Sequence, residues 1–468
     1  MRQRIGLWLG PLLFTVVVLL PLPQGMSPAA QYLAAVTLLM AAWWISEALP
    51  IAATALLPIV LFPLLGITSL AQATAPYANP MVYLFLGGFL IAMAMQRWAL
   101  HRRIALHTIQ LVGSSPRRII LGFMLATAFL SMWISNTATA MMMLPIALAV
   151  IAQRQDTGEG AGFATALMLG IAYAASIGGV ATLIGTPPNA ILAGILQEQY
   201  GITLGFAQWL AFALPLSLTM LLLAWLYLTR VICGATDDEG EGANTLIEEQ
   251  LHHLGPIGRE EQRVLAVFVL VAGAWVGRGL LDIGWLNQLG DAGIALGGAL
   301  LLFLIPAAGG GRLLDWASAV KLPWEILLLF GGGFSLAAGF VESGLTAWLV
   351  AQLGGLQGMP IWLLLCSVVL LVIFLTEVTS NTATATIVLP LLGALAGAMG
   401  QQPTLLMVPA AIAASYAFML PVATPPNAIV FGGGHVTIPQ MARAGIWMNL
   451  LATVLICGLI LLFPSLQL

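Results

Sequence analysis

Two short polar strings, each present twice in an otherwise apolar chain, contain the residues best suited to bind a solute. The first is Ser135-Asn136-Thr137-Ala138-Thr139-Ala140, repeated as Ser380-Asn381-Thr382-Ala383-Thr384-Ala385. The second is Gly185-Thr186-Pro187-Pro188-Asn189-Ala190-Ile191, with a copy reading Ala423-Thr424-Pro425-Pro426-Asn427-Ala428-Ile429. Polar side chains and paired prolines disfavour an unbroken helix in hydrocarbon, because the freed backbone groups need other partners. The strings therefore predict helix breaks at which a polar ligand is held.

Each string also predicts the start of a helix. Ser, Asn and Thr are preferred N-cap residues, and the Ala-Thr-Ala after each Ser-Asn-Thr can begin a returning helix. Thr186 and Thr424 are placed as N-caps, with Pro187 and Pro425 at the first helical position, where a missing N–H costs nothing. Four helix N-termini would then converge on one cavity, and such ends attract anions.

Oxygen atoms around the same breaks form a set suited to a hard cation such as Na⁺. Carbonyl groups near Gly185 and Ala423 lose their helical partners. The side chains that add oxygens are those of Ser131, Ser135, Asn136, Thr376, Ser380 and Asn381. No Lys, Arg or His lies near any of the four strings, so a multiply charged anion would need cations to travel with it. Protons are the alternative to sodium.

Composition sets the class of protein. The 468 residues are 60% hydrophobic and 7% charged, against roughly 25% charged in soluble domains. The chain is therefore expected to be an integral membrane protein in contact with lipid. A net charge of −3 gives no reason to expect a nucleic-acid partner, and no cofactor motif is present. The chain offers no nucleophile–base pair or metal set at membrane depth, which argues against an enzyme.

The apolar segments predict an all-α polytopic membrane protein with about 11 transmembrane helices. We expect two re-entrant hairpins, at 118–152 and 360–398, and two broken helices, at 162–199 and 403–432. If both hairpins enter and leave on one side, every Lys and Arg except Arg278 falls on a single face. That bias predicts a cell (inner) membrane protein whose N-terminus is cytoplasmic.

The two halves of the chain repeat. Gly87-Gly88-Phe89 matches Gly332-Gly333-Phe334, and Ser135 and Ser380 have the same spacing from these landmarks. An odd number of crossings between matched landmarks would invert the halves, which is the layout of secondary transporters. The expected division is a first helix at 1–29, repeat 1 at 30–233, a cytosolic linker at 234–262 and repeat 2 at 263–468.

Some polar residues fall outside the strings. Residues 98–112 mix basic and apolar groups and predict a helix at the membrane interface. Glu377 either titrates during transport or hydrogen-bonds the backbone of its hairpin, and we favour the second. Glu47 and Asp291, near predicted span ends, are interpreted as capping or interfacial groups.

At these residues the chain resembles the divalent anion–sodium symporter family, in its dicarboxylate-transporter type. Both Ser-Asn-Thr tips, both Thr-Pro breaks, the repeated Gly-Gly-Phe and the mid-chain linker agree in order. The resemblance implies a homodimer in which a domain carrying both hairpins moves like an elevator. It implies one sodium site made by Ser131, Ser135, Asn136 and Gly185. It implies a second made by Thr376, Ser380, Asn381 and Ala423. The implied substrate-binding residues are Asn136, Thr137, Thr186, Pro187, Ser380, Asn381, Thr382, Thr424 and Pro425.

The sequence therefore predicts a sodium-coupled importer of C4-dicarboxylates such as succinate, malate or fumarate. A sodium-independent dicarboxylate exchanger, a citrate or sulfate symporter and an anion channel are the alternatives. The identity of the anion depends on the volume of the pocket, and the ion stoichiometry is open.

Overall fold

The computed structural model describes residues 2–113, 115–155, 161–233, 242–281, 283–352 and 359–462, and these are helical with short connections. The helices of the first half are α1 (Arg2–Leu19), α2 (Pro28–Ser46), α3 (Ile51–Thr54), α4 (Leu57–Leu64), α5 (Leu70–Thr74), α6 (Pro80–Arg97), α7 (Leu100–Val112), α8 (Pro116–Ser131), α9 (Asn136–Gln155), α10 (Ala161–Val180), α11 (Pro187–Tyr200) and α12 (Phe206–Tyr227), with a 3₁₀ turn at Ala75–Ala78 and a π-helical turn at Leu228–Cys233.

The last seven helices of the second half follow the order of α6 to α12. The helices of this half are α13 (Gly242–Leu254), α14 (Arg259–Leu280), α15 (Gly284–Leu304), α16 (Trp316–Ala319), α17 (Trp324–Glu342), α18 (Leu345–Gln352), α19 (Ile361–Thr376), α20 (Asn381–Ala398), α21 (Thr404–Ser415), α22 (Pro425–Gly432) and α23 (Ile438–Leu462). Ten described helices are long and apolar enough to cross a membrane. The predicted all-α polytopic membrane fold is confirmed.

The two hairpins are helix pairs whose first arms are short. α8 and α19 have 16 residues each, about 24 Å at 1.5 Å per residue, which is less than a hydrocarbon core of about 30 Å. Four residues separate each arm from the returning helix, α9 or α20. Each first arm is therefore shorter than a helix that crosses the hydrocarbon core.

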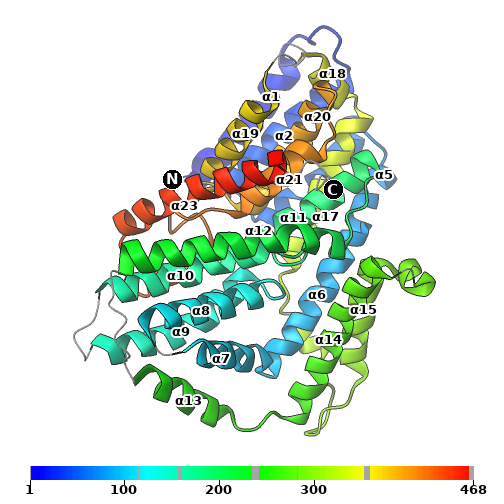
Figure 1. The fold of residues 1–468 in the computed structure, drawn as a ribbon. Helices are drawn as coiled ribbons and strands as arrows, with labels where there is room; N and C mark the ends of the chain where they lie inside the picture. The colour runs from blue at the N-terminus through cyan, green and yellow to red at the C-terminus, as the bar shows by residue number, and fades with distance from the viewer. Residues whose placement is uncertain are drawn as a thin grey trace.

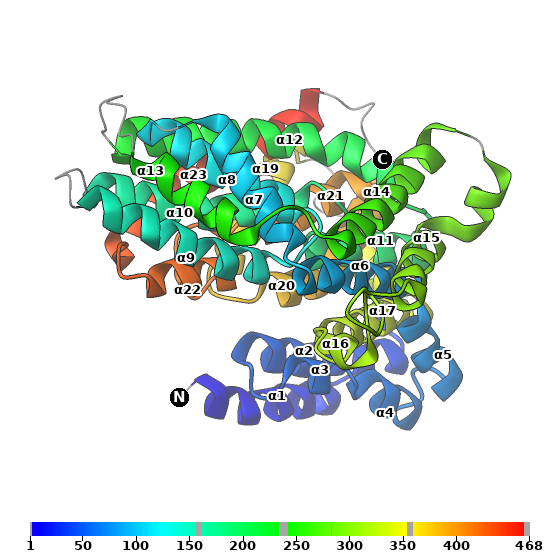
Figure 2. The same ribbon diagram turned by 90° about the horizontal axis from the view of Figure 1, so that it is seen from below.

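Three of the four arms of the broken helices, α10, α11 and α21, lie mostly in the interior, and α22 is half-buried. α10 is buried along almost its whole length. It packs against α8, α9, α12 and α22, and Figure 1 shows it beside α8 and α9 with α12 running across. Figure 2 shows α1 to α4 gathered along one side, where a smaller hydrophobic cluster joins α2 and α4 to α17.

The apolar segment at 50–66 is long enough to predict a crossing, but it forms two short helices, α3 and α4, with a turn at Ala55 and Leu56. Pro58 and Pro63 fall within this stretch, and each removes a backbone N–H from the helical ladder. Pro58, in the first turn of α4, cannot donate to the carbonyl four residues earlier, so the helix is interrupted before it.

Arg278, the single basic residue predicted on the opposite membrane face, has a partner. Its Nη1 lies 2.6 Å from Oδ1 of Asp291, and the other carboxylate oxygen accepts the Phe206 N–H at the start of α12, at 2.8 Å. Asp291 is 7% exposed and Arg278 is half-buried, and the carboxylate joins α12, α14 and α15. The capping interpretation of Asp291 is confirmed, with the cap made across helices.

α7 holds the described part of the mid-chain linker in place. Arg103 pairs with Glu261 at 3.0 Å and donates to the Gly255 carbonyl at 2.9 Å. α13, which packs on α7 and α9, lies within the stretch predicted as a linker. Residues 234–241 of that stretch lie outside the described residues.

The repeated Gly-Gly-Phe landmarks mark close approaches between helices. A Cβ on Gly87 of α6 would lie 2.6 Å from the Ala295 carbonyl carbon of α15. A Cβ on Gly332 of α17 would collide with the carbonyl oxygen of Ala55. The two glycines occupy equivalent positions of the repeat, and each lets another backbone approach where a side chain would not fit.

Gly87→Ala and Gly332→Ala should each lower the melting temperature of the purified protein, because the added methyl group meets backbone that cannot rotate away. Overpacking of this kind costs about 1–3 kcal/mol. Gly297→Ala on α15 is the control, since nothing lies within 4 Å of the Cβ built there. Equal melting temperatures for Gly332→Ala and Gly297→Ala in a detergent thermal-shift assay would contradict the packing argument.

Candidate functional site

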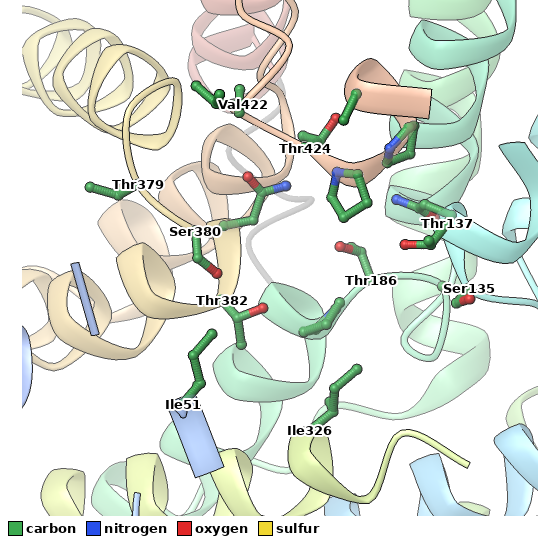
Figure 3. Close-up of a pocket in the computed structure, with 18 of the residues that line it drawn as sticks. Ile51, Ser135, Thr137, Thr186, Ile326, Thr379, Ser380, Thr382, Val422 and Thr424 are labelled. Carbon is green, nitrogen blue, oxygen red and sulfur yellow. The ribbon is translucent and has the colours of Figure 1, made fainter. Parts of the chain in front are cut away.

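The four predicted helix breaks meet at one cavity of about 440 Å³. Both hairpin tips and both Thr-Pro turns line it, together with apolar residues of α3, α6 and α17. Figure 3 shows Ser380 and Thr382 of one hairpin facing the cavity from one side, and Ser135 and Thr137 of the other hairpin from the opposite side. The predicted binding residues that line it are Ser135, Asn136, Thr137, Gly185, Thr186, Pro187, Ser380, Asn381, Thr382, Ala423, Thr424 and Pro425.

Two predicted ligand residues lie behind the cavity wall. Ser131 and Thr376 are fully buried and do not line the cavity. Each contacts the asparagine of its own hairpin through a hydroxyl, and Thr376 Oγ1 donates to Asn381 Oδ1 at 2.7 Å. They therefore lie close enough to share a site with Asn136 and Asn381.

Two of the four helix starts, at Ser135 and Thr424, have the predicted side-chain cap, whereas Ser380 and Thr186 have none. Thr424 has extended backbone, and its hydroxyl accepts the Asn427 N–H at 3.2 Å, as an N-cap does. Thr186 has the same backbone conformation without a side-chain cap, and its hydroxyl lies 3.4 Å from the Ser415 hydroxyl. The first turn of α11 begins with Pro187 and Pro188, which have no N–H, and the Asn189 N–H donates to the Thr186 carbonyl at 3.2 Å.

The first hairpin tip holds a cluster of oxygens. With its amide oriented to satisfy its neighbours, Asn136 Nδ2 donates to the carbonyl oxygens of Gly185 and Ala175, each at 3.2 Å, and it also contacts Ser131 Oγ. Ser131 Oγ donates to the Ala175 carbonyl at 2.7 Å. Two carbonyl oxygens and one hydroxyl oxygen thus converge on a single amide group. These are neutral oxygens of the kind that a hard monovalent cation accepts.

The second hairpin repeats this arrangement. Thr376 Oγ1 bridges Asn381 Oδ1, at 2.7 Å, and the carbonyl of Ala414, at 2.9 Å. Ala414 lies on α21, as Ala175 lies on α10. A hydroxyl, an asparagine amide group and a carbonyl oxygen are therefore brought together twice, once at each hairpin tip.

The unwound stretches are held by two asparagines that the sequence reasoning did not select. Asn189 Nδ2 donates to the carbonyls of Val180 and Thr182, at 3.1 and 2.7 Å. Asn427 Nδ2 donates to those of Ala417 and Leu420, each at 3.0 Å. Both residues stand in the duplicated Pro-Pro-Asn string, so the duplication itself was the signal. They fix the backbone that carries Gly185 and Ala423.

Glu377 holds the second break from outside. Its carboxylate accepts the N–H groups of Phe418, Met419 and Leu420, at 2.7, 2.9 and 3.1 Å, and the Asn449 side-chain amide at 2.8 Å. The predicted role as a backbone acceptor is confirmed, but the backbone belongs to the α21–α22 break and not to the hairpin. The position of Glu377 in the sequence, three residues before Ser380, does not show which segment its carboxylate will contact.

The charge of the cavity differs in one respect from expectation. Among the described lining residues none is basic, as predicted, but Glu47 contributes a carboxylate. Glu47 is the left-handed C-cap of α2, with φ 54°. Glu47 therefore caps α2, as interpreted from its position near a span end. The left-handed turn at Glu47 also places its side chain at the cavity, and the sequence position alone did not indicate this.

Glu377→Gln should weaken sodium binding at the second break, because the amide nitrogen cannot accept the Leu420 N–H and the carbonyls before Ala423 lose their fixed geometry. We expect about a tenfold loss of apparent sodium affinity in uptake assays, with a smaller change in maximal rate. Glu342→Gln, an exposed carboxylate at the end of α17, is the control. Sodium dependence identical to wild type in Glu377→Gln would show that this carboxylate does not position the break.

The fold and the cavity define a multi-pass membrane transporter. Residues 4–466 match the family model described as "Sodium:sulfate symporter transmembrane region". The chain belongs to this family, in agreement with the resemblance read from its motifs, and its members are transporters and not enzymes.

Similar proteins include two that are named sodium-dependent dicarboxylate transporter SdcS. The one from Staphylococcus saprophyticus is 46% identical over 466 residues, covering 97% of this chain and 90% of the relative. The one from Staphylococcus aureus is 47% identical with the same coverage.

Two solved structures share the fold at low sequence identity. Neisseria gonorrhoeae MtrF, described as an antimetabolite efflux pump, has a TM-score of 0.61 at 13% identity, covering 98% of this chain and 94% of its own. The Alcanivorax borkumensis YdaH transporter has a TM-score of 0.60 at 14% identity, covering 99% and 98%. At this identity the likeness concerns architecture alone.

Proposed function

We propose that this protein imports small dicarboxylates, such as succinate, malate or fumarate, together with sodium ions. The observation that carries the proposal is that Asn136 and Asn381, each grouped with a hydroxyl and a carbonyl oxygen, line the same cavity, in which no described lining residue is basic. The names of the staphylococcal relatives agree with it. A cavity of about 440 Å³ falls within the range of small-molecule sites, which is roughly 300–1,000 Å³.

Two sodium sites follow from the clusters. The first uses Ser131, Ser135, Asn136 and the Gly185 carbonyl. The second uses Thr376, Ser380, Asn381 and the Ala423 carbonyl. All donors are neutral oxygens, which a hard monovalent cation accepts and a soft metal does not.

The substrate lies between the two ions. Its carboxylates meet the hydroxyl and amide groups of Asn136, Thr137, Asn381 and Thr382, and the Thr-Pro turns at Thr186-Pro187 and Thr424-Pro425. The N-termini of α9, α11, α20 and α22 add the positive ends of four helix dipoles. Since Asn136 and Asn381 can serve ion and substrate at once, loading of one favours loading of the other.

Sodium is needed because the cavity has no fixed positive charge. A dianion placed among dipoles, with Glu47 in the same cavity, is strongly disfavoured at low dielectric. Two bound cations offset that cost. Sodium binding and substrate binding are therefore coupled by electrostatics. Bound sodium ions raise the affinity of the cavity for the anion, and the bound anion raises its affinity for sodium by the same factor.

The remaining expectations belong to the same proposal. The unit carrying both hairpins moves across the membrane like an elevator against the part built on α1 to α4, and two chains form a homodimer. The protein lies in the cell membrane with its N-terminus in the cytoplasm, as the placement of basic residues indicates. The divisions 1–29, 30–233, 234–262 and 263–468 are the proposed units of the chain.

Purified protein in proteoliposomes should concentrate labelled succinate only when an inward sodium gradient is present. Replacing external sodium by potassium should reduce uptake to background, because potassium is too large for oxygens placed around sodium. Uptake that depends on internal dicarboxylate and ignores sodium would show an exchanger. Flux that never exceeds equilibration would show a channel.

Asn136→Ala and Asn381→Ala should each reduce sodium-driven uptake by at least about a hundredfold, because each asparagine serves an ion and a carboxylate. Thr139→Ala is a matched control on the same helix turn: its hydroxyl is buried, does not line the cavity and lacks a partner among the described residues. Near-normal uptake in either asparagine variant, with Thr139→Ala also active, would refute the shared site.

A further inference from the structure

A second cavity, of about 330 Å³, lies apart from the candidate transport site. It is enclosed by the start of α10, the π-helical turn after α12 and the start of α23. The first two elements touch closely, since a Cβ on Gly162 would lie 2.6 Å from the carbonyl oxygen of Cys233. π-helical turns recur at functional sites, because the widened backbone leaves room beside it.

The cavity lies at the depth of the lipid headgroups. The continuous apolar helix from Phe206 to Cys233 has 28 residues, which is about 40 Å, against about 30 Å of hydrocarbon and 40–45 Å with headgroups. Tyr227 and Val231 line the cavity within its last seven residues. Arg230 on the same turn and Arg117 at the start of α8 bring further positive charge to this end, where Trp225 donates to the Arg117 carbonyl at 2.9 Å.

Arg443 is the one charged residue among the described residues that line the cavity. No hydrogen bond or ion pair joins its guanidinium group to another described residue. No described residue accepts a hydrogen bond from the Tyr227 hydroxyl, the Trp447 indole or the Gln440 amide nitrogen. The side-chain carbonyl of Gln440 accepts the Thr437 hydroxyl at 2.8 Å. The cavity thus gathers one unpaired cation and three free donors, which together suit a phosphate oxygen cluster.

The mouth of the cavity is apolar and faces outward. Val231 is 68% exposed and Trp447 is 59% exposed, and both lie on its rim. Trp447 stands one helical turn after Arg443 on the same face of α23. An apolar rim outside a cationic floor matches a molecule with a charged head and hydrocarbon chains.

We propose that this cavity binds the phosphate group of an anionic phospholipid, with the acyl chains leaving over Val231 and Trp447. Basic cavities between helices on the cytoplasmic side commonly hold such headgroups. The lipid would tie α10, which carries the first broken helix, to α12 and α23. Under the proposed orientation the site faces the leaflet that is rich in anionic lipid.

Native mass spectrometry of the delipidated full chain with phosphatidylglycerol or phosphatidylcholine tests this site. We expect one tightly held phosphatidylglycerol per chain and no comparable phosphatidylcholine. Arg443→Gln should weaken retention about fivefold, Arg443→Lys should weaken it less, and Tyr227→Phe should give a partial loss in a chain that keeps every charge. Equal retention of the two lipids, or full retention in Arg443→Gln and Tyr227→Phe, would overturn the proposal.

Arg230→Gln is the matched control, because Arg230 is exposed on the same turn but does not line the cavity. It should retain phosphatidylglycerol as the wild type does, and a loss equal to that of Arg443→Gln would indicate general surface charge and overturn the site. Inorganic phosphate at about 20 mM separates the two sources of the anion. Failure to displace the lipid supports a phospholipid, whereas complete displacement would assign the cavity to a free phosphate ion and overturn the lipid assignment.

Discussion

The structure depends on how backbone groups are satisfied where helices end inside the membrane. Hydrocarbon offers no hydrogen bonds, and each unpaired N–H or C=O there costs several kcal/mol. This chain contains four such breaks and gives several of their backbone groups a protein partner: Asn189 and Asn427 donate to carbonyls, and Glu377 accepts three N–H groups. The four breaks line one cavity, so the candidate binding site lies where the helices are interrupted.

The two halves solve this problem with different side chains. In the second half Glu377 holds the break, whereas in the first half Met132 occupies the matching position and its carbonyl accepts the Thr182 hydroxyl at 2.5 Å. A buried carboxylate in one repeat alone makes the two breaks electrostatically unequal. We infer that the two proposed sodium sites differ in affinity, since their oxygens are similar but the segments that carry them are anchored differently.

Much of this arrangement could be predicted from the sequence, because the informative residues come in matched pairs. The duplicated strings located the hairpin tips and helix breaks, and these line one cavity as the strings indicated. Glu47 was not placed there, because its position follows from a left-handed turn at the end of α2 that spacing does not reveal. The division of segment 50–66 into two helices was not predicted, because the hydropathy of the segment was given more weight than Pro58 and Pro63. The lipid cavity was also out of reach, because its residues come from three distant segments.

The central claim is that sodium completes the site for the anion. Isothermal titration of succinate into purified protein, at a series of sodium concentrations with potassium keeping the ionic strength constant, tests this most directly. The account predicts that the logarithm of the association constant rises with the logarithm of sodium concentration, with a slope of one or more and no measurable binding in potassium alone. Equal succinate affinity in sodium and in potassium would contradict it.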